Sequence, residues 1–91
     1  MSREVAKRFG TNLAHLREQA KVTQEELAFR ASLHRTEIGL LERGGRIPRI
    51  DTLAKLAGAL GVEPGALFEG ITWTPGDFRR GQFKPDDPAT L

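Results

Sequence analysis

The sequence contains no cysteine and only two histidines among its 91 residues. The lack of cysteine excludes disulfide bonds, thiolate metal ligands and a thiol nucleophile, and it fits a reducing compartment. His15 and His34 are too far apart in sequence to suggest a metal site, and the glycines form neither a dinucleotide-binding loop nor a phosphate-binding loop. No nucleophile, base and orienting group come together, so we expect no enzyme activity, no metal and no cofactor.

The chain also lacks a long apolar run. No stretch approaches the roughly 18 residues that a membrane span needs, and the N-terminus has no signal-peptide core. We therefore expect a soluble, cytoplasmic protein without a membrane partner. Fourteen basic residues against twelve acidic ones give a net charge of only +2, so the positions of the charges must indicate the partner. A chain of this length has room for one small domain.

Apolar residues recur at helical spacing through the first 70 residues. The pair Thr23 and Glu26 forms a capping box at the start of the second helix, and glycines stop the later helices. The predicted fold class is therefore all-α, a compact five-helix domain over residues 1–70. The expected helices cover residues 3–20, 24–31, 34–43, a segment from Ile50 or Asp51 to residue 60, and a short fifth segment from Pro64 to Phe68.

Composition changes after Gly70. Residues 71–91 combine proline, glycine and aspartate with a few bulky apolar side chains. The segment 71–74 alternates with period two and the turn dipeptide Pro75-Gly76 follows, so the tail is either a small hairpin or non-helical and irregular. We expect its last seven residues, 85–91, to be disordered.

Residues 24–43 carry the most specific pattern in the chain. Two short helices that meet at a steep angle need a small residue at their contact, a tight turn and a buried apolar residue after the turn; Ala28, Ser32 and Leu33 meet these needs. Apolar residues stand at the inward positions of both segments. This is the pattern of a helix-turn-helix motif, whose second helix lies in the major groove of DNA.

The region from about Phe9 to Gly70 resembles the phage-repressor family of helix-turn-helix proteins, also called the Cro/repressor-type or xenobiotic-response-element family. The segments TQEELAFRA, IGLLERG, RIP and TLAKLAGALGV match the family's motifs at the right spacing. The resemblance implies a repressor-like, DNA-binding fold and a role in transcription regulation. Ser32 departs from the family's usual glycine, which accommodates positive φ; a serine there costs on the order of 1 kcal/mol.

Burial of Ile38 and Leu41 would turn the opposite side of segment 34–43 outward, where the resemblance places base-reading residues. An arginine can bond guanine O6 and N7 together, and a threonine can contact a base edge or a thymine methyl group. Glu37 would accept from cytosine N4 or simply discourage a nearby phosphate. The predicted base-reading residues are Arg35, Thr36, Gly39, which allows close approach to DNA, and Leu40, which either contacts a thymine methyl group or packs within the protein.

Charge gathers in the same region. Residues 30–49 hold five arginines and two glutamates, a local net charge of +3, while the other 71 residues sum to −1. The arginines either face DNA or only keep the domain soluble. Free N–H groups at a helix N-terminus also favour an anion. The predicted phosphate contacts are Thr23, Gln24, His34, Arg43, Arg46 and Arg49.

The resemblance further implies a partly buried ion pair between Arg17 and Glu42, which would orient the third helix. It also implies a homodimer that reads two half-sites of a palindromic operator. Three readings follow: a dimeric repressor that binds double-stranded DNA, an antitoxin or controller protein that binds DNA and a protein partner through residues 71–91, and a scaffold that no longer binds DNA. The candidate dimer or partner surface consists of Val62, Phe68, Trp73, Phe78 and Phe83.

Overall fold

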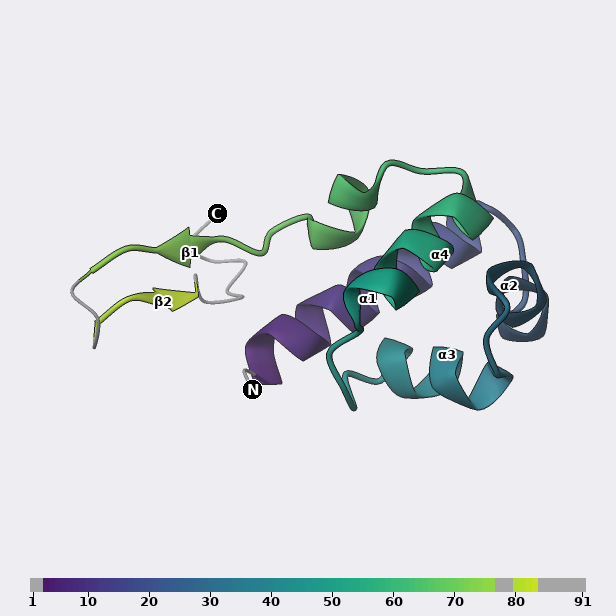
Figure 1. The fold of residues 1–91 in the computed structure, drawn as a ribbon, viewed down its shortest axis with the longest axis horizontal. Helices are drawn as coiled ribbons and strands as arrows, with labels where there is room; N and C mark the ends of the chain where they lie inside the picture. Colours follow the sequence, from purple (N-terminus) through teal and green to yellow (C-terminus); the bar gives the residue numbers. More distant parts are fainter. Residues whose placement is uncertain (1–2, 77–79, 84–91) are drawn as a thin grey trace.

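The computed structural model describes residues 3–76 and 80–83. Four α-helices come first, then one turn of 3-10 helix and a two-stranded hairpin (Figure 1). The four predicted α-helices are confirmed, each to within about a residue at its ends. In chain order the elements are α1 (Arg3–Gln19), α2 (Gln24–Ala31), α3 (Arg35–Glu42), α4 (Ile50–Leu60), the 3-10 helix η1 (Pro64–Phe68), β1 (Trp73–Thr74) and β2 (Gln82–Phe83).

The prediction of a fifth α-helix is wrong. Residues Pro64–Phe68 form a 3-10 helix, whose first turn is closed by a hydrogen bond from Ala66 N–H to the Glu63 carbonyl, 2.9 Å long. The segment is five residues long and starts with proline and glycine, so it offers too few donors and too little helix propensity for an α-helix. Gly70, with φ of 82°, then redirects the chain.

Local capping explains where α2 begins and where α4 ends. The Thr23 hydroxyl accepts a 3.0 Å hydrogen bond from Glu26 N–H, as the capping box predicts. The Glu26 carboxylate accepts instead from Arg30, at 2.9 Å, one turn further along α2. Gly61 ends α4 in the left-handed conformation, with φ of 70°.

One apolar core joins all four α-helices and η1. Helix α3 packs against α1 and α2, α2 packs against α4, and η1 packs against α1 and α4. Among the described residues, none of the helices is long and apolar enough to cross a membrane. The largest fully buried side chains are Phe9, Leu13, Leu27, Ile38, Leu41, Leu56 and Leu67.

Asn12, a buried residue of α1, holds the end of η1 through hydrogen bonds. Its amide donates two hydrogen bonds of 2.9 Å, to the carbonyls of Leu67 and Glu69. Both carbonyls lie near the end of η1, where helix geometry leaves acceptors without intrahelical donors. The point from which the C-terminal segment leaves the helices is therefore held from α1.

Of the two structures predicted for the tail, the hairpin is confirmed. Trp73 pairs with Phe83 and Thr74 with Gln82 in an antiparallel register, and the two aromatic rings meet edge to face at 5.1 Å. The hairpin lies at one end of the molecule's long axis and α2 at the other (Figure 1). Residues 77–79 and 84–91 lie outside the described part of the chain, and so does the predicted disorder of the last seven residues.

Candidate nucleic-acid interface

The turn between α2 and α3 has the geometry that the sequence pattern requires. Ser32 adopts the left-handed conformation, with φ of 56° and ψ of 44°, although it carries a side chain. The N–H of Leu33 then donates to the Ala28 carbonyl at 2.9 Å, which closes the turn. Ala28 is buried at the contact of the two helices, and His34 starts α3 in an extended conformation. Residues 24–42 thus form the helix-turn-helix that the sequence predicts.

The first turn of α3 presents its polar side chains to solvent. His34, Arg35 and Thr36 are exposed, while Ile38 on the same helix is fully buried. Among the described residues, Arg35 has no acidic partner. This places a free guanidinium and a hydroxyl together at the N-terminal end of α3, the part of a recognition helix that contacts base edges.

The second half of α3 differs from the prediction. Gly39 is buried, which contradicts the expectation that it faces outward, because the guanidinium of Arg43 lies over it; a Cβ at Gly39 would come within 3.1 Å of Arg43 Nη1. Leu40 is half-buried and lies across Gly45, so closely that a Cβ on Gly45 would overlap its side chain. In this structure Leu40 therefore packs against the turn that follows α3.

The residues predicted to hold phosphate already have intramolecular partners in several cases. Arg46 Nη1 donates to Glu37 Oε1 at 2.8 Å, and Arg49 Nε lies 3.2 Å from Asp51 Oδ1. The arginine side chains are 53% and 84% exposed, so these are surface ion pairs, and the other N–H groups of each guanidinium can still donate to a phosphate. The region remains basic, since Arg35 and Arg43 have no ion-pair partner among the described residues.

A polar network joins α3 to α1 and α2. Arg17 of α1 donates to both carboxylate oxygens of Glu42, with Nε–Oε2 of 2.6 Å and Nη2–Oε1 of 3.2 Å. Gln24, the first residue of α2, donates to the same Glu42 Oε1 at 2.9 Å. Arg17 also donates to the Val22 carbonyl. The structure thus brings Arg17 and Glu42 together, as the resemblance implies, and adds Gln24 to the pair.

The network is largely shielded from water. Side chains of Arg17 and Glu42 are only 15% and 8% exposed. The hydrogen bond to the Glu42 carboxylate is the largest cause of a pKa of Arg17 raised above its ordinary value, with burial acting in the opposite direction. A bidentate arginine–carboxylate pair fixes both distance and orientation. It therefore holds the C-terminal end of α3 at a defined angle to α1.

Gly10, which is not among the predicted site residues, provides a second contact behind α3. A Cβ at this position would overlap the carbonyl oxygens of Leu41 and Glu42, so the backbones of α1 and α3 approach as closely as a glycine allows. The only signal in the sequence is a glycine inside the apolar stripe of the first helix. Such a glycine indicates close packing, but it does not identify the neighbour.

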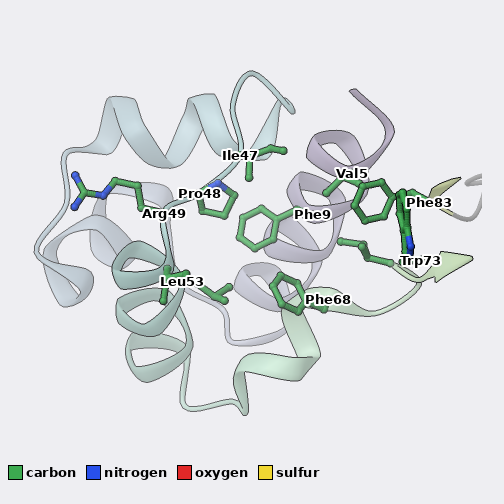
Figure 2. Close-up of a pocket in the computed structure, with 11 residues that line it drawn as sticks. Val5, Phe9, Ile47, Pro48, Arg49, Leu53, Phe68, Trp73 and Phe83 are labelled. Atoms are coloured by element: carbon green, nitrogen blue, oxygen red, sulfur yellow. The ribbon is translucent and has the colours of Figure 1, made fainter. Parts of the chain in front are cut away.

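An apolar hollow of about 440 Å³ lies beside the hairpin (Figure 2). Its two sides are the aromatic pair Trp73 and Phe83 and the helical side chains around Phe9 and Leu53, while the Arg49 guanidinium points away from the other lining side chains. Of the predicted dimer or partner surface, Phe68, Trp73 and Phe83 line this hollow. Val62 packs against the core instead, and Phe78 lies outside the described residues.

Four of the five exposed large apolar side chains of the described chain also line this hollow: Ile47, Ile50, Phe68 and Trp73, with exposed fractions between 39% and 86%. Ile47 and Ile50 lie in and just after the loop that joins α3 to α4. The described residues contain no group of three or more metal-ligating side chains. The apolar hollow and the polar face of α3 are two candidate binding surfaces.

Comparison with known proteins shows that they share this helix-turn-helix arrangement. The family model "Helix-turn-helix" matches residues 13–67. The chain is 37% identical over 73 residues to the control protein C.BamHI of Bacillus amyloliquefaciens, covering 79% of this chain and 90% of that one. It is 36% identical over 58 residues to the immunity repressor protein of Bacillus phage phi105, covering 64% of this chain and 40% of that one.

Among solved structures, the fold is similar to the restriction-modification controller protein C.AhdI from Aeromonas hydrophila. The TM-score is 0.68 at 41% sequence identity, and the match covers 69% of this chain and 96% of that one. Named relatives of this kind are helix-turn-helix regulators of transcription, a class of DNA-binding proteins and not of enzymes.

Proposed function

Because the chain belongs to the helix-turn-helix family of phage-repressor-like DNA-binding transcription regulators, we propose that it is a sequence-specific, dimeric repressor. Residues 34–43 enter the major groove of double-stranded DNA, and two copies read the halves of a palindromic operator. The observation that carries the proposal is the first turn of α3, where Arg35 and Thr36 are exposed side by side on a helix held rigidly from behind.

Within this proposal, base reading belongs to the outward side chains of α3. Arg35 bonds O6 and N7 of a guanine, and Thr36 contacts a neighbouring base edge or a thymine methyl group. Gly39 contributes only if Arg43 leaves its position over it when the protein binds DNA, and Leu40 only if its side chain moves away from Gly45. A move of Arg43 to a phosphate would uncover this part of the helix.

Phosphate contacts then surround α3. Thr23 and Gln24 can keep their intramolecular bonds and still hold an anion, since the hydroxyl retains its proton and the amide a second N–H. His34 lies at the start of α3, and Arg46 and Arg49 follow it. Together with Arg43, these groups would fix the protein's register on the duplex without reading its sequence.

The apolar hollow supports the dimer. Ile47 and Ile50, which line it, lie in and just after the loop that follows α3, so a second copy seated here would lie close to the end of the recognition helix. Half-sites of such dimers lie about 34 Å apart, one turn of DNA. A two-stranded hairpin is marginal by itself in water, and contact with a partner would stabilise it.

Selection of bound duplexes from a randomised pool tests the proposal, with the wild type and Arg35→Ala run in parallel. We expect the wild type to enrich a two-fold-symmetric site and the variant to lose one base preference in each half. Arg30→Ala is the matched control, because Arg30 is an arginine of the same basic region whose side chain is bonded along α2. If the wild type enriches no sequence even at low salt, where phosphate contacts are strongest, the proposal is wrong.

A second function, a controller protein that also binds a protein partner through residues 71–91, is favoured by the 56% exposure of Trp73. The similarity to the control protein C.BamHI and to the restriction-modification controller C.AhdI supports the controller form of this idea over the antitoxin form. Sedimentation of the full-length wild type separates the two functions. A dimer that Trp73→Ala weakens assigns the hollow to a second copy, whereas a monomer at all concentrations leaves it to another protein.

A further inference from the structure

Glu37 is the one acidic residue in the first turn of α3, and its carboxylate is held in place. Arg46, from the loop after α3, donates its Nη1–H to Glu37 Oε1 at 2.8 Å. The Glu37 side chain is 23% exposed, against 53% for Arg46. Among the described residues Oε2 of Glu37 accepts no hydrogen bond, so one oxygen is fixed and the other is available.

A lone carboxylate on a recognition helix would be repelled by the phosphates of DNA. The guanidinium of Arg46 cancels that charge at hydrogen-bonding distance, and the pair as a whole is neutral. Arg46 also restricts the rotation of the Glu37 side chain. The pair therefore allows an acceptor to approach the duplex at a defined position on the first turn of α3.

We propose that Glu37 and Arg46 act together as a base-reading unit in which Glu37 Oε2 accepts a hydrogen bond from the N4 amino group of a cytosine. In the major groove this amino group is the donor that a glutamate is suited to read. Arg46 is the positioning residue of the unit. The inference rests on the proposed function and adds a cytosine in each half-site to the guanine read by Arg35.

A rival arrangement would use the same two residues differently. If Glu37 only competes with DNA phosphate for Arg46, its removal frees a cation and strengthens binding to every sequence alike. If Glu37 reads cytosine, its removal erases one base preference. The ratio of affinities for two duplexes separates the two cases, because phosphate contacts cancel in that ratio.

The test uses the operator duplex selected by the wild type and copies in which one cytosine at a time is replaced by 2-pyrimidinone, which lacks only the N4 amino group. For the wild-type protein we expect a loss of affinity of about tenfold at one cytosine in each half-site. Glu37→Ala should be insensitive to that replacement. Arg46→Ala should bind all duplexes more weakly and discriminate less at the same cytosine.

Glu26→Ala is the matched control, since Glu26 forms a comparable surface ion pair with Arg30 on α2, and it should discriminate as the wild type does. Thermal melting of each variant verifies that the fold is kept. Equal sensitivity of Glu37→Ala and wild type at every cytosine overturns the inference, and so does uniformly tighter binding with unchanged ratios. A wild type that selects no sequence overturns the proposed function itself, and the inference with it.

Discussion

Behind α3, the backbones of α1 and α3 meet at Gly10 and a largely buried network joins Arg17, Glu42 and Gln24. Beside the hairpin, in contrast, apolar side chains line a hollow of about 440 Å³ and Trp73 remains 56% exposed. The first region consists of short, directional contacts between elements that are far apart in sequence. The second consists of apolar side chains that line an open hollow, with Trp73 and Phe83 in edge-to-face contact on one side of it.

Under the proposed function, this difference lets one small chain meet two requirements. A helix that reads DNA must keep its angle, and bidentate hydrogen bonds together with close backbone contact define an angle better than apolar contact does. A surface that accepts a partner needs exposed apolar area, and the hollow offers it. Changes behind α3 should therefore affect folding and DNA binding together, whereas changes at the hollow should affect association.

Arg17→Ala should have the largest effect, because it leaves the Glu42 carboxylate, only 8% exposed, without its cation. We expect the free energy of unfolding to fall by about 3–5 kcal/mol, with weaker DNA binding alongside. Denaturant unfolding and a binding titration measure the two effects. Arg30→Ala, which breaks an exposed pair within α2, should cost less than about 1 kcal/mol. Lost DNA affinity at an unchanged melting temperature would instead assign Arg17 to a phosphate contact.

The stability that the Arg17–Glu42 pair contributes should not change with pH near neutrality. The hydrogen bond to Glu42 raises the pKa of Arg17 above its ordinary value, which lies well above neutral. A raised folded-state pKa contributes stability that is complete below the ordinary value and is lost only as pH rises through the raised one. The difference in unfolding free energy between wild type and Arg17→Ala should therefore stay constant from about pH 6 to about pH 9. A difference that shrinks across this window would contradict the assignment.

Gly10→Ala should have the second-largest effect on the free energy of unfolding. The added methyl group overlaps backbone oxygens of α3, which cannot move aside as a flexible side chain can. We expect a loss of about 2–3 kcal/mol of unfolding free energy and a measurable loss of DNA affinity. Gly58→Ala is the control, since nothing lies within 4 Å of the new methyl group and α4 gains helix propensity, about 0.5–1 kcal/mol. Equal stabilities of the two variants would show that α1 and α3 are not in tight contact.

Ser32→Gly, unlike Arg17→Ala and Gly10→Ala, should stabilise the protein. Serine holds φ of 56° at the turn between α2 and α3, a conformation that glycine adopts without steric cost. We expect unfolding free energy to rise by about 0.5–1 kcal/mol while DNA affinity stays the same. Thermal melting and a binding titration check both parts. A lower melting temperature would mean that the serine side chain makes a stabilising contact.

Trp73→Ala should have the smallest effect on the fold and mark the hollow as a separate region. Because Trp73 is half exposed and lies at the end of the molecule, we expect a change in unfolding free energy below about 1 kcal/mol. The dissociation constant of the dimer should rise by about tenfold or more, as for an aromatic anchor at an interface. Sedimentation at several concentrations measures it. Unaltered association would remove the hollow from the dimer interface.

Much of the fold could be predicted because its signals are local. Capping at Thr23, the turn at Ser32 and the apolar stripe of each α-helix all depend on residues a few positions apart, and the structure reproduces them. The α-helix predicted from Pro64 is wrong because proline is suited to the first turn of either kind of helix. Five residues were then too few to form more than a 3-10 turn.

The candidate site was harder to predict where a side chain contacts another part of the protein instead of solvent. The spacing of Ile38 and Leu41 places Gly39 outside the core, but it does not show that Arg43 lies over it. Nor does the sequence indicate that Gln24 is bonded to Glu42 or Arg46 to Glu37. These contacts join residues 9 to 18 positions apart and depend on how the helices are oriented in space. The roles assigned to these residues in DNA binding stay predictions.

The close approach of α1 and α3 at Gly10 has a consequence for how such a protein can change over generations. Contacts that hold the helix lie on its inner side and at its C-terminal end, and they involve none of the exposed side chains at positions 35 and 36. Under the proposed function, substitutions at those two positions would alter the preferred operator without disturbing the contacts that hold the helix. A lineage of such regulators can acquire new targets one residue at a time while inheriting the same scaffold.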